Sequence, residues 1–209
     1  MKQKDNQTPK QGHSANMLLY AVAPQPKLST DAIALEGAVV SRGNGIGATS
    51  ETYIMDCIVG MKHYPDKYFD LAVVDPPYGI GRDGKPKSTS SHGGHKGYKF
   101  KGWDSKPPEK GYFSELFRIS KNQIIWGANY FIKHVYNSPG WILWDKGQRI
   151  DQADGELAWT SFKKPLRIFT LNRVAIQTDG AIHPTQKPIK LYDWIFKNYS
   201  EPGQKIIDT

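Results

Sequence analysis

Asp75, Pro76, Pro77 and Tyr78 form the part of the sequence whose residue types and order best suit chemistry. They follow the apolar run 70–74, which predicts a buried strand that ends on the Asp75 carboxylate. A proline fixes its φ angle and donates no backbone N–H, so nearby carbonyl oxygens stay free to accept hydrogen bonds from a ligand. With the aromatic face of Tyr78, these acceptors suit an –NH2 group on a flat heterocycle. The alternative is a strand end with a rigid turn and a surface tyrosine.

The chemistry that such acceptors could assist is attack by the amine on an electrophile. An amino group conjugated with an aromatic base is a poor nucleophile, because its lone pair is delocalised into the ring. Acceptors that hold both N–H bonds favour a pyramidal nitrogen and expose the lone pair. The four residues therefore predict a site that holds an exocyclic amine during group transfer.

The elements that position these residues alternate between strands and helices. Amphipathic spacing predicts helices over 112–120 and 188–200, and one or two helical turns are expected over 57–64. Apolar runs predict strands over 52–55, 70–74, 122–127, 141–145, 167–171 and 204–208. This alternation predicts an α/β fold with a mainly parallel sheet. Ligands of such sheets bind beyond the carboxyl ends of the strands, where Asp75 is expected.

The N-terminal part of the chain breaks this alternation. Residues 1–50 are polar at the start and glycine-rich at the end, so we predict a flexible segment there, before a domain over 51–209. A phosphate-binding loop at Gly43, Gly45 and Gly47 is the alternative to a linker. No strand–turn–helix pattern surrounds these glycines, which favours the linker.

A second interruption, the basic loop over 82–110, has eight Lys or Arg residues against three acids, interleaved with aromatic residues. Such a sequence suits phosphate contacts and base stacking, and a solvated insertion is the alternative. Two histidines in this loop, His92 and His95, have no further ligands in the pattern, so we predict no metal site. The candidate nucleic-acid-binding residues are Arg82, Lys85, Lys87, Lys96, Lys99 and Lys101.

Composition limits the class of protein. The 209 residues suit one domain, with a net charge of +8 and a pI near 9.4. This charge favours a polyanionic partner such as nucleic acid, although a basic protein without such a partner has the same composition. The single cysteine, Cys57, excludes an intrachain disulfide and a cysteine-cluster zinc site. Without a signal-peptide pattern or an apolar run of about 20 residues, we expect a cytoplasmic protein and no membrane anchor.

The stretch DPPYGIG (75–81) resembles the catalytic motif of DNA amino-methyltransferases, which methylate adenine N6 or cytosine N4. IHPTQKP (182–188) is similar to the motif that precedes the cofactor-binding strand in that family. MDC (55–57) and YPDKYFDLAVVDPPY (64–78) resemble the family's opening, with methionine in place of the usual glycine. The resemblance extends from Thr52 to Thr209. Further stretches resemble its adenine-methylating branch, common in phages and prophages: SKNQIIWGANYF, WILWDK and GELAWTSF.

The resemblance implies a Rossmann-like, S-adenosylmethionine-dependent methyltransferase sheet with double-stranded DNA as its partner. The target amine would donate to the Asp75 carboxylate and to the Pro76 carbonyl oxygen. Tyr78 would stack on the base, Pro77 would keep the turn rigid, and the aspartate of the motif favours adenine N6. Asp56 matches the acid that accepts from the adenine amino group of the cofactor. The resemblance places further cofactor contacts at Thr185, Gln186, Lys187 and Asp208.

In this family a glycine-rich turn and a helix follow the strand that 204–208 resembles, whereas this sequence stops at Thr209. We therefore expect a sheet that is incomplete at its C-terminus, weak or no cofactor binding by this chain, and a second chain as a candidate partner that completes the fold. One alternative function is a catalytically silent methyltransferase-like subunit that binds nucleic acid or a partner chain. Another is an amino-methyltransferase that acts on RNA or protein.

Overall fold

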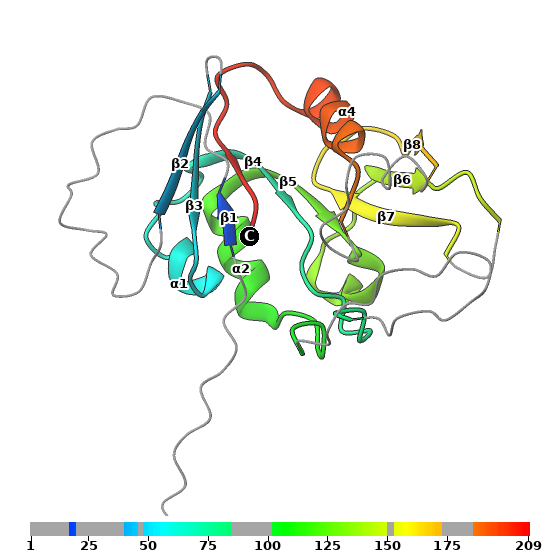
Figure 1. Ribbon diagram of the computed structural model, residues 1–209, viewed down its shortest axis with the longest axis horizontal. Helices are drawn as coiled ribbons and strands as arrows, with labels where there is room; N and C mark the ends of the chain where they lie inside the picture. The colour runs from blue at the N-terminus through cyan, green and yellow to red at the C-terminus, as the bar shows by residue number, and fades with distance from the viewer. Residues whose placement is uncertain (1–16, 20–39, 46–47, 85–101, 150–152, 173–185) are drawn as a thin grey trace, which may run out of the picture.

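The computed structural model describes residues 17–19, 40–45, 48–84, 102–149, 153–172 and 186–209. Its central feature is a six-stranded sheet with the strand order β8-β6-β7-β5-β4-β9 (Figure 1). The strands are β4 (Phe69–Val74), β5 (Ser120–Trp126), β6 (Trp141–Asp145), β7 (Gly155–Thr160), β8 (Arg167–Thr170) and β9 (Ile206–Ile207). All but β7 were predicted as strands, within a few residues at each end.

Five of the six strands run in one direction. β4 is parallel to β5 and to β9, and β6 is parallel to β8. β7 is antiparallel to both of its neighbours, β5 and β6, so it alone runs the other way. The predicted α/β fold with a mainly parallel sheet is confirmed, and this architecture is compatible with a Rossmann-like fold. Because β7 starts where its neighbours end, its first residues lie at their carboxyl edge.

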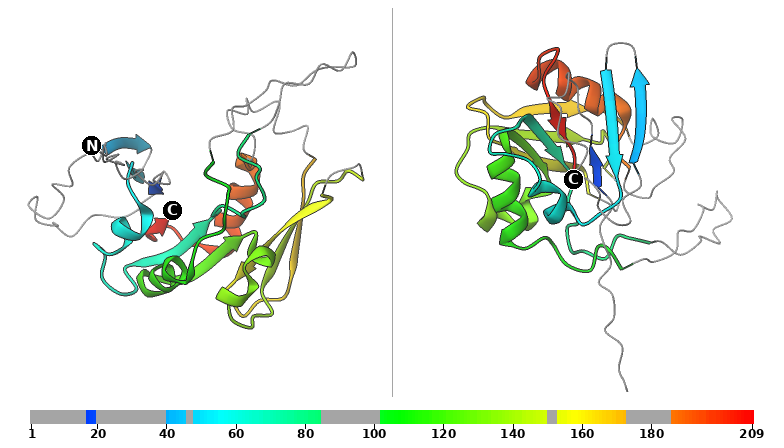
Figure 2. Two further views of the ribbon diagram at one scale, coloured as in Figure 1. Left: turned by 90° about the horizontal axis from the view of Figure 1, so that it is seen from below. Right: turned by 90° about the vertical axis from the view of Figure 1, so that its left-hand side faces the viewer.

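Helices cover both faces of the sheet (Figure 2). α1 (Cys57–Met61) and α2 (Lys110–Ile119) pack on one face, and α4 (Ile189–Tyr199) packs on the other. All three were predicted as helices, within a few residues at each end. Along β4, Ala72 and Val74 join the core under α1 and α2, whereas Leu71 and Val73 join the core under α4. Each fully buried Val or Leu side chain of this kind stabilises the fold by about 1.5–3 kcal/mol. None of the described helices is both long and apolar enough to cross a membrane.

A second, antiparallel sheet precedes α1 and has the order β1-β3-β2. Its strands are β1 (Met17–Leu19), β2 (Val40–Gly45) and β3 (Ala48–Tyr53). These strands lie within the segment predicted as flexible over 1–50, most of which is outside the described residues, and the β2–β3 hairpin crosses the boundary predicted after residue 50. The strand predicted over 52–55 is the end of β3 and does not belong to the main sheet. Pairing satisfies the backbone groups of this glycine-rich segment, whose sequence has no apolar periodicity.

Candidate functional site

The carboxyl ends of β9, β4 and β5 meet at one edge of the sheet, and the candidate site lies there. Asp75 follows β4, Gly127 follows β5 and Asp208 follows β9. Glu156, the second residue of β7, lies at the same edge because β7 runs the opposite way. Lys187 reaches this edge from the segment before α4. The predicted position of Asp75 at a strand end is therefore confirmed.

The Asp75 carboxylate accepts hydrogen bonds from two side chains. The Tyr78 hydroxyl donates to Oδ1 at 2.6 Å, and the Lys187 ammonium donates to Oδ2. Lys187 Nζ also lies 3.3 Å from the Tyr78 hydroxyl oxygen. A carboxylate oxygen has two lone pairs, so each oxygen of Asp75 can accept one further bond. The structure thus joins residues from two motifs that lie 112 positions apart.

The Tyr78 ring packs against the turn that follows β5. The Tyr130 ring stacks on it, with 5.1 Å between the ring centroids and 17° between the ring planes. Gly127 makes room for this packing, because a Cβ at that position would lie 2.1 Å from the Tyr78 ring. The Gly127 φ angle of +68° also favours glycine. Tyr130 was not predicted as a site residue; it is 49% exposed, so the outer side of the stack is open to solvent.

Lys187 belongs to a chain of four charged groups. Its ammonium lies 3.3 Å from one Glu156 oxygen, and the other Glu156 oxygen accepts from Lys146 at 2.5 Å. Only 2% of the Lys187 side chain is exposed. Its Nζ lies 5.2 Å from the centroid of the Trp126 ring, a favourable distance for a cation–π contact. The fourth member is Asp75, and the sequence analysis predicted a role for neither Glu156 nor Lys146.

Electrostatic contacts keep the central pair charged despite its burial. Burial lowers the pKa of Lys187, but the charges of Asp75 and Glu156 outweigh this effect and raise the pKa. Burial raises the pKa of Glu156, but the charges of Lys187 and Lys146 outweigh it, so the pKa is lowered. The pKa of Tyr78 is raised by burial and then by the charge of Asp75, so its phenol stays neutral. Lys187 and Glu156 are therefore an ion pair at neutral pH.

A buried carboxylate, Asp104, fixes the turn that follows Tyr78. It accepts the backbone N–H of Gly79 at 2.7 Å and that of Arg82 at 2.6 Å. Asp104 itself is buried, and Gly79 has a φ angle of +74° that favours glycine. The Arg82 side chain is exposed, as a contact with a DNA phosphate requires. Asp104 was not predicted, because it lies in a basic segment without apolar periodicity.

Asp208 marks the predicted cofactor side of the site. It lies half-buried at the end of β9. Burial, followed by the charge of Asp75, raises the pKa of its carboxyl to about 8. The hydroxyl of the next residue, Thr209, shares a hydrogen bond of 2.6 Å with the Tyr112 hydroxyl. A cation bound at this edge would weaken the repulsion between Asp208 and Asp75 and favour the ionised form of Asp208.

The other predicted residues take separate positions. Asp56 is exposed and accepts the backbone N–H of the third residue of α1, so it is the N-cap of that helix. Pro76 is buried and Pro77 is half-buried in the turn after β4, and Gln186 is half-buried immediately before Lys187. Their roles toward cofactor and base stay predictions. Six predicted residues lie outside the described part of the chain: Lys85, Lys87, Lys96, Lys99, Lys101 and Thr185.

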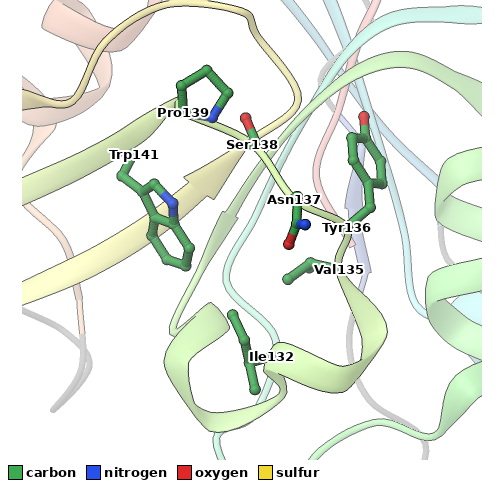
Figure 3. Close-up of a pocket in the computed structure, with 7 residues that line it drawn as sticks. All are labelled: Ile132, Val135, Tyr136, Asn137, Ser138, Pro139 and Trp141. Atoms are coloured by element: carbon green, nitrogen blue, oxygen red, sulfur yellow. The ribbon is translucent and has the colours of Figure 1, made fainter.

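A separate pocket of about 360 Å³ lies near the amino end of β6, where Figure 3 shows its lining residues. Trp141 is the first residue of β6, whereas Lys146 follows the other end of the same strand. The pocket therefore lies away from the charged groups around Asp75, and no predicted site residue lines it. Its lining consists of Ile132, Val135, Tyr136, Asn137, Ser138, Pro139 and Trp141.

No protein-family model and no curated protein matches this chain. Within the described ranges, no three His, Cys, Asp or Glu side chains gather in a way that could hold a metal ion. A functional interpretation therefore depends on the geometry around Asp75, Tyr78 and Lys187 and on the resemblance of the sequence motifs.

Proposed function

We propose that the protein is an S-adenosylmethionine-dependent DNA methyltransferase that methylates the exocyclic amine of a flipped base, namely adenine N6. The observation that carries this proposal is the joint position of Asp75 and Tyr78 at the carboxyl edge of the sheet. A carboxylate acceptor and an aromatic ring lie together there, a combination that a turn alone does not need. The resemblance of the DPPY and HPTQKP motifs to those of DNA amino-methyltransferases supports the same reaction.

Asp75 and Pro76 would prepare the amine for attack. One N–H of the amine donates to a lone pair of the Asp75 carboxylate, and the second donates to the Pro76 carbonyl oxygen. Both acceptors favour a pyramidal nitrogen and expose its lone pair. When bound, S-adenosylmethionine would supply the methyl carbon to which this lone pair forms the new N–C bond, and the electron pair of the broken C–S bond would stay on its sulfur. The nitrogen then releases a proton to water, and no covalent bond to the enzyme forms.

The cofactor side of the site suits a cation. S-adenosylmethionine, when bound, supplies a methyl group on a positively charged sulfur. Burial and the charge of Asp75 keep Asp208 largely protonated at neutral pH, and a positive charge beside the two residues would favour the ionised Asp208 carboxylate. Asp56, at the start of α1, and Gln186, before Lys187, are further candidate contacts for the polar parts of the cofactor.

The target base must leave the DNA helix before its amine can reach Asp75. Rotating a base out of the duplex costs on the order of a few kcal/mol. Contacts between basic side chains and phosphates can offset this cost, and the net charge of +8 and the exposed Arg82 suit that role. Tyr130 already stacks on Tyr78, so the rotated base would stack against this pair of rings on the side that is open to solvent.

A second candidate function is a silent methyltransferase-like subunit that binds nucleic acid or a partner chain. One observation favours it: both Asp75 oxygens already accept hydrogen bonds, from Tyr78 and from Lys187. If these contacts persisted, the amine would share the carboxylate with a buried ammonium and could use only the lone pairs that Tyr78 and Lys187 leave open. The two functions differ in whether the chain uses S-adenosylmethionine.

Calorimetric titration with S-adenosylmethionine separates the two functions. The sequence analysis predicts weak or no binding by this chain, whereas the proposed function requires the wild-type chain to bind S-adenosylmethionine. If it binds, we expect a loss of about tenfold or more in Asp56→Ser, since a hydrogen bond to a charged group is removed. Serine keeps the cap of α1, because it is a preferred N-cap residue, but its side chain is too short to reach the ligand. Asp193→Ser, which changes an exposed acid on α4, is the control. A wild-type chain that binds duplex DNA but no S-adenosylmethionine would favour the silent subunit.

A further inference from the structure

The charged chain of Lys146, Glu156, Lys187 and Asp75 contains two groups that the proposed reaction does not use. These are Lys146 and Glu156. Glu156 contacts both lysines, at 2.5 Å from Lys146 Nζ and 3.3 Å from Lys187 Nζ. Both lysines are nearly inaccessible, with 7% of the Lys146 side chain and 2% of the Lys187 side chain exposed. Two buried cations thus share one glutamate beside the predicted catalytic carboxylate.

Lys187 lies between two carboxylates. Its ammonium donates to Asp75 Oδ2 and lies within ion-pair distance of Glu156 Oε2. A buried ammonium that loses its counter-ion is strongly destabilised, so Lys187 can leave Asp75 only if another anion is close. Glu156 meets this condition without any movement of the backbone. Lys146 holds Oε1 of the same carboxylate, which leaves Oε2 directed at Lys187.

We propose that Glu156 is a positioning residue, the second counter-ion that receives the Lys187 ammonium when Asp75 accepts the substrate amine. This inference rests on the proposed function, because it gives Asp75 an amine as its ligand. Before the amine binds, Lys187 and Tyr78 hold the Asp75 carboxylate in place. When it binds, Lys187 shifts toward Glu156 and Oδ2 of Asp75 becomes available. The rings of Trp126 and Tyr78, centred 5.2 and 5.7 Å from Nζ, favour the ammonium throughout.

Kinetics of methyl transfer to duplex DNA test this assignment. Glu156→Gln keeps the shape of the side chain and removes its charge. We expect kcat to fall by about 10- to 100-fold, the loss typical of a misplaced reacting group, while KM for S-adenosylmethionine stays within about twofold. The same substitution in a Lys187→Met chain should lower kcat no further, because Glu156 acts through Lys187. A glutamate that only stabilised the fold would not show this dependence on Lys187.

The chain offers a matched control. Glu115 pairs with Arg118 at 2.8 Å and has 21% of its side chain exposed, against 25% for Glu156, but the pair lies within α2 and outside the charged chain. Glu115→Gln should therefore keep the wild-type kcat. Glu156→Asp keeps the charge and should restore part of the activity. If Glu156→Gln does not fold, the double variant Glu156→Gln with Lys146→Gln is measured in its place. This double variant keeps the net charge of the cluster.

The outcomes separate the inference from the function on which it rests. Two results would overturn the role of Glu156 while the methyltransferase function stands. One is a wild-type kcat in Glu156→Gln; the other is a loss of kcat on adding Glu156→Gln to the Lys187→Met chain that equals its loss in the wild-type chain. A folded wild-type chain that transfers no methyl group to DNA would contradict the proposed function, and the role of Glu156 would be withdrawn with it.

Discussion

Replacing Gly127 by alanine should destabilise the chain more than its backbone angle alone explains. At a φ angle of +68°, a residue other than glycine costs about 1–2 kcal/mol. A Cβ there would also lie 2.1 Å from the Tyr78 ring, so the ring must move. Movement of the ring breaks the 2.6 Å hydrogen bond to Asp75, which contributes about 1.5–3 kcal/mol. It also breaks the stack on Tyr130, which contributes about 0.5–1.5 kcal/mol. We therefore expect a total loss of about 3–6.5 kcal/mol in the free energy of unfolding.

Gly81→Ala isolates the backbone contribution. Gly81 has the same φ angle of +68°, and no heavy atom of the described residues lies within 4 Å of its Cβ position. Equilibrium unfolding in urea should give a loss of only about 1–2 kcal/mol for this variant. In a Tyr78→Ala chain, Gly127→Ala should cost no more than Gly81→Ala, because the clash is gone. Equal losses for the two alanine variants in the wild-type chain would refute the role of the Tyr78 contact.

Tyr130, Asp208 and Asp104 offer three further tests. Tyr130→Ala should lower kcat/KM for DNA by the equivalent of about 1–3 kcal/mol of stacking. Tyr136→Ala, which changes a comparably exposed tyrosine that packs on Phe117 and Trp159, should not, and equal values would contradict the stack. Asp208 keeps a proton in the folded chain that it loses on unfolding. The free energy of unfolding, relative to Asp208→Asn, should therefore fall as the pH rises from 3.8 to about 8, whereas parallel curves would contradict the raised pKa. Each oxygen of Asp104 accepts one backbone N–H, and Asp104→Asn replaces one of these oxygens by an NH2 donor. Urea unfolding should therefore show a loss of about 1.5–3 kcal/mol in the free energy of unfolding. An unchanged unfolding midpoint would contradict its role in the turn.

The sequence predicted the fold where apolar runs carry the signal. The run that forms β4 has an unbroken apolar stretch, so its carboxyl end at Asp75 could be placed from the sequence alone. The direction of β7 could not, because pairing with β5 and β6 is decided by tertiary contacts and not by its own pattern. β2 was missed because its glycines and Asn44 have low strand propensity, and only the end of β3 was predicted; the hairpin pairing of the two strands compensates for this.

The candidate site was predictable only where its residues are neighbours in the chain. Asp75 and Tyr78 stand three positions apart around two prolines, which identifies them locally. Lys187 was noticed through its motif, but its contact with Asp75 spans 112 positions and leaves no local pattern. Glu156 pairs across the sheet with the residue two positions before Lys146, so the register of β6 and β7 places both side chains on one face. Sequence spacing does not reveal that register.

Identification of methylated nucleosides tests the proposed reaction most directly. Unmethylated duplex DNA of mixed sequence is incubated with the chain and methyl-labelled S-adenosylmethionine, then digested to nucleosides that are quantified by mass spectrometry. We predict labelled N6-methyladenine with the wild-type chain, an unchanged yield with Glu115→Gln, and a yield lower by about 100-fold or more with Asp75→Ala. A folded wild-type chain that gives no labelled nucleoside, or an Asp75→Ala chain that gives the wild-type yield, would contradict the proposed methyltransferase.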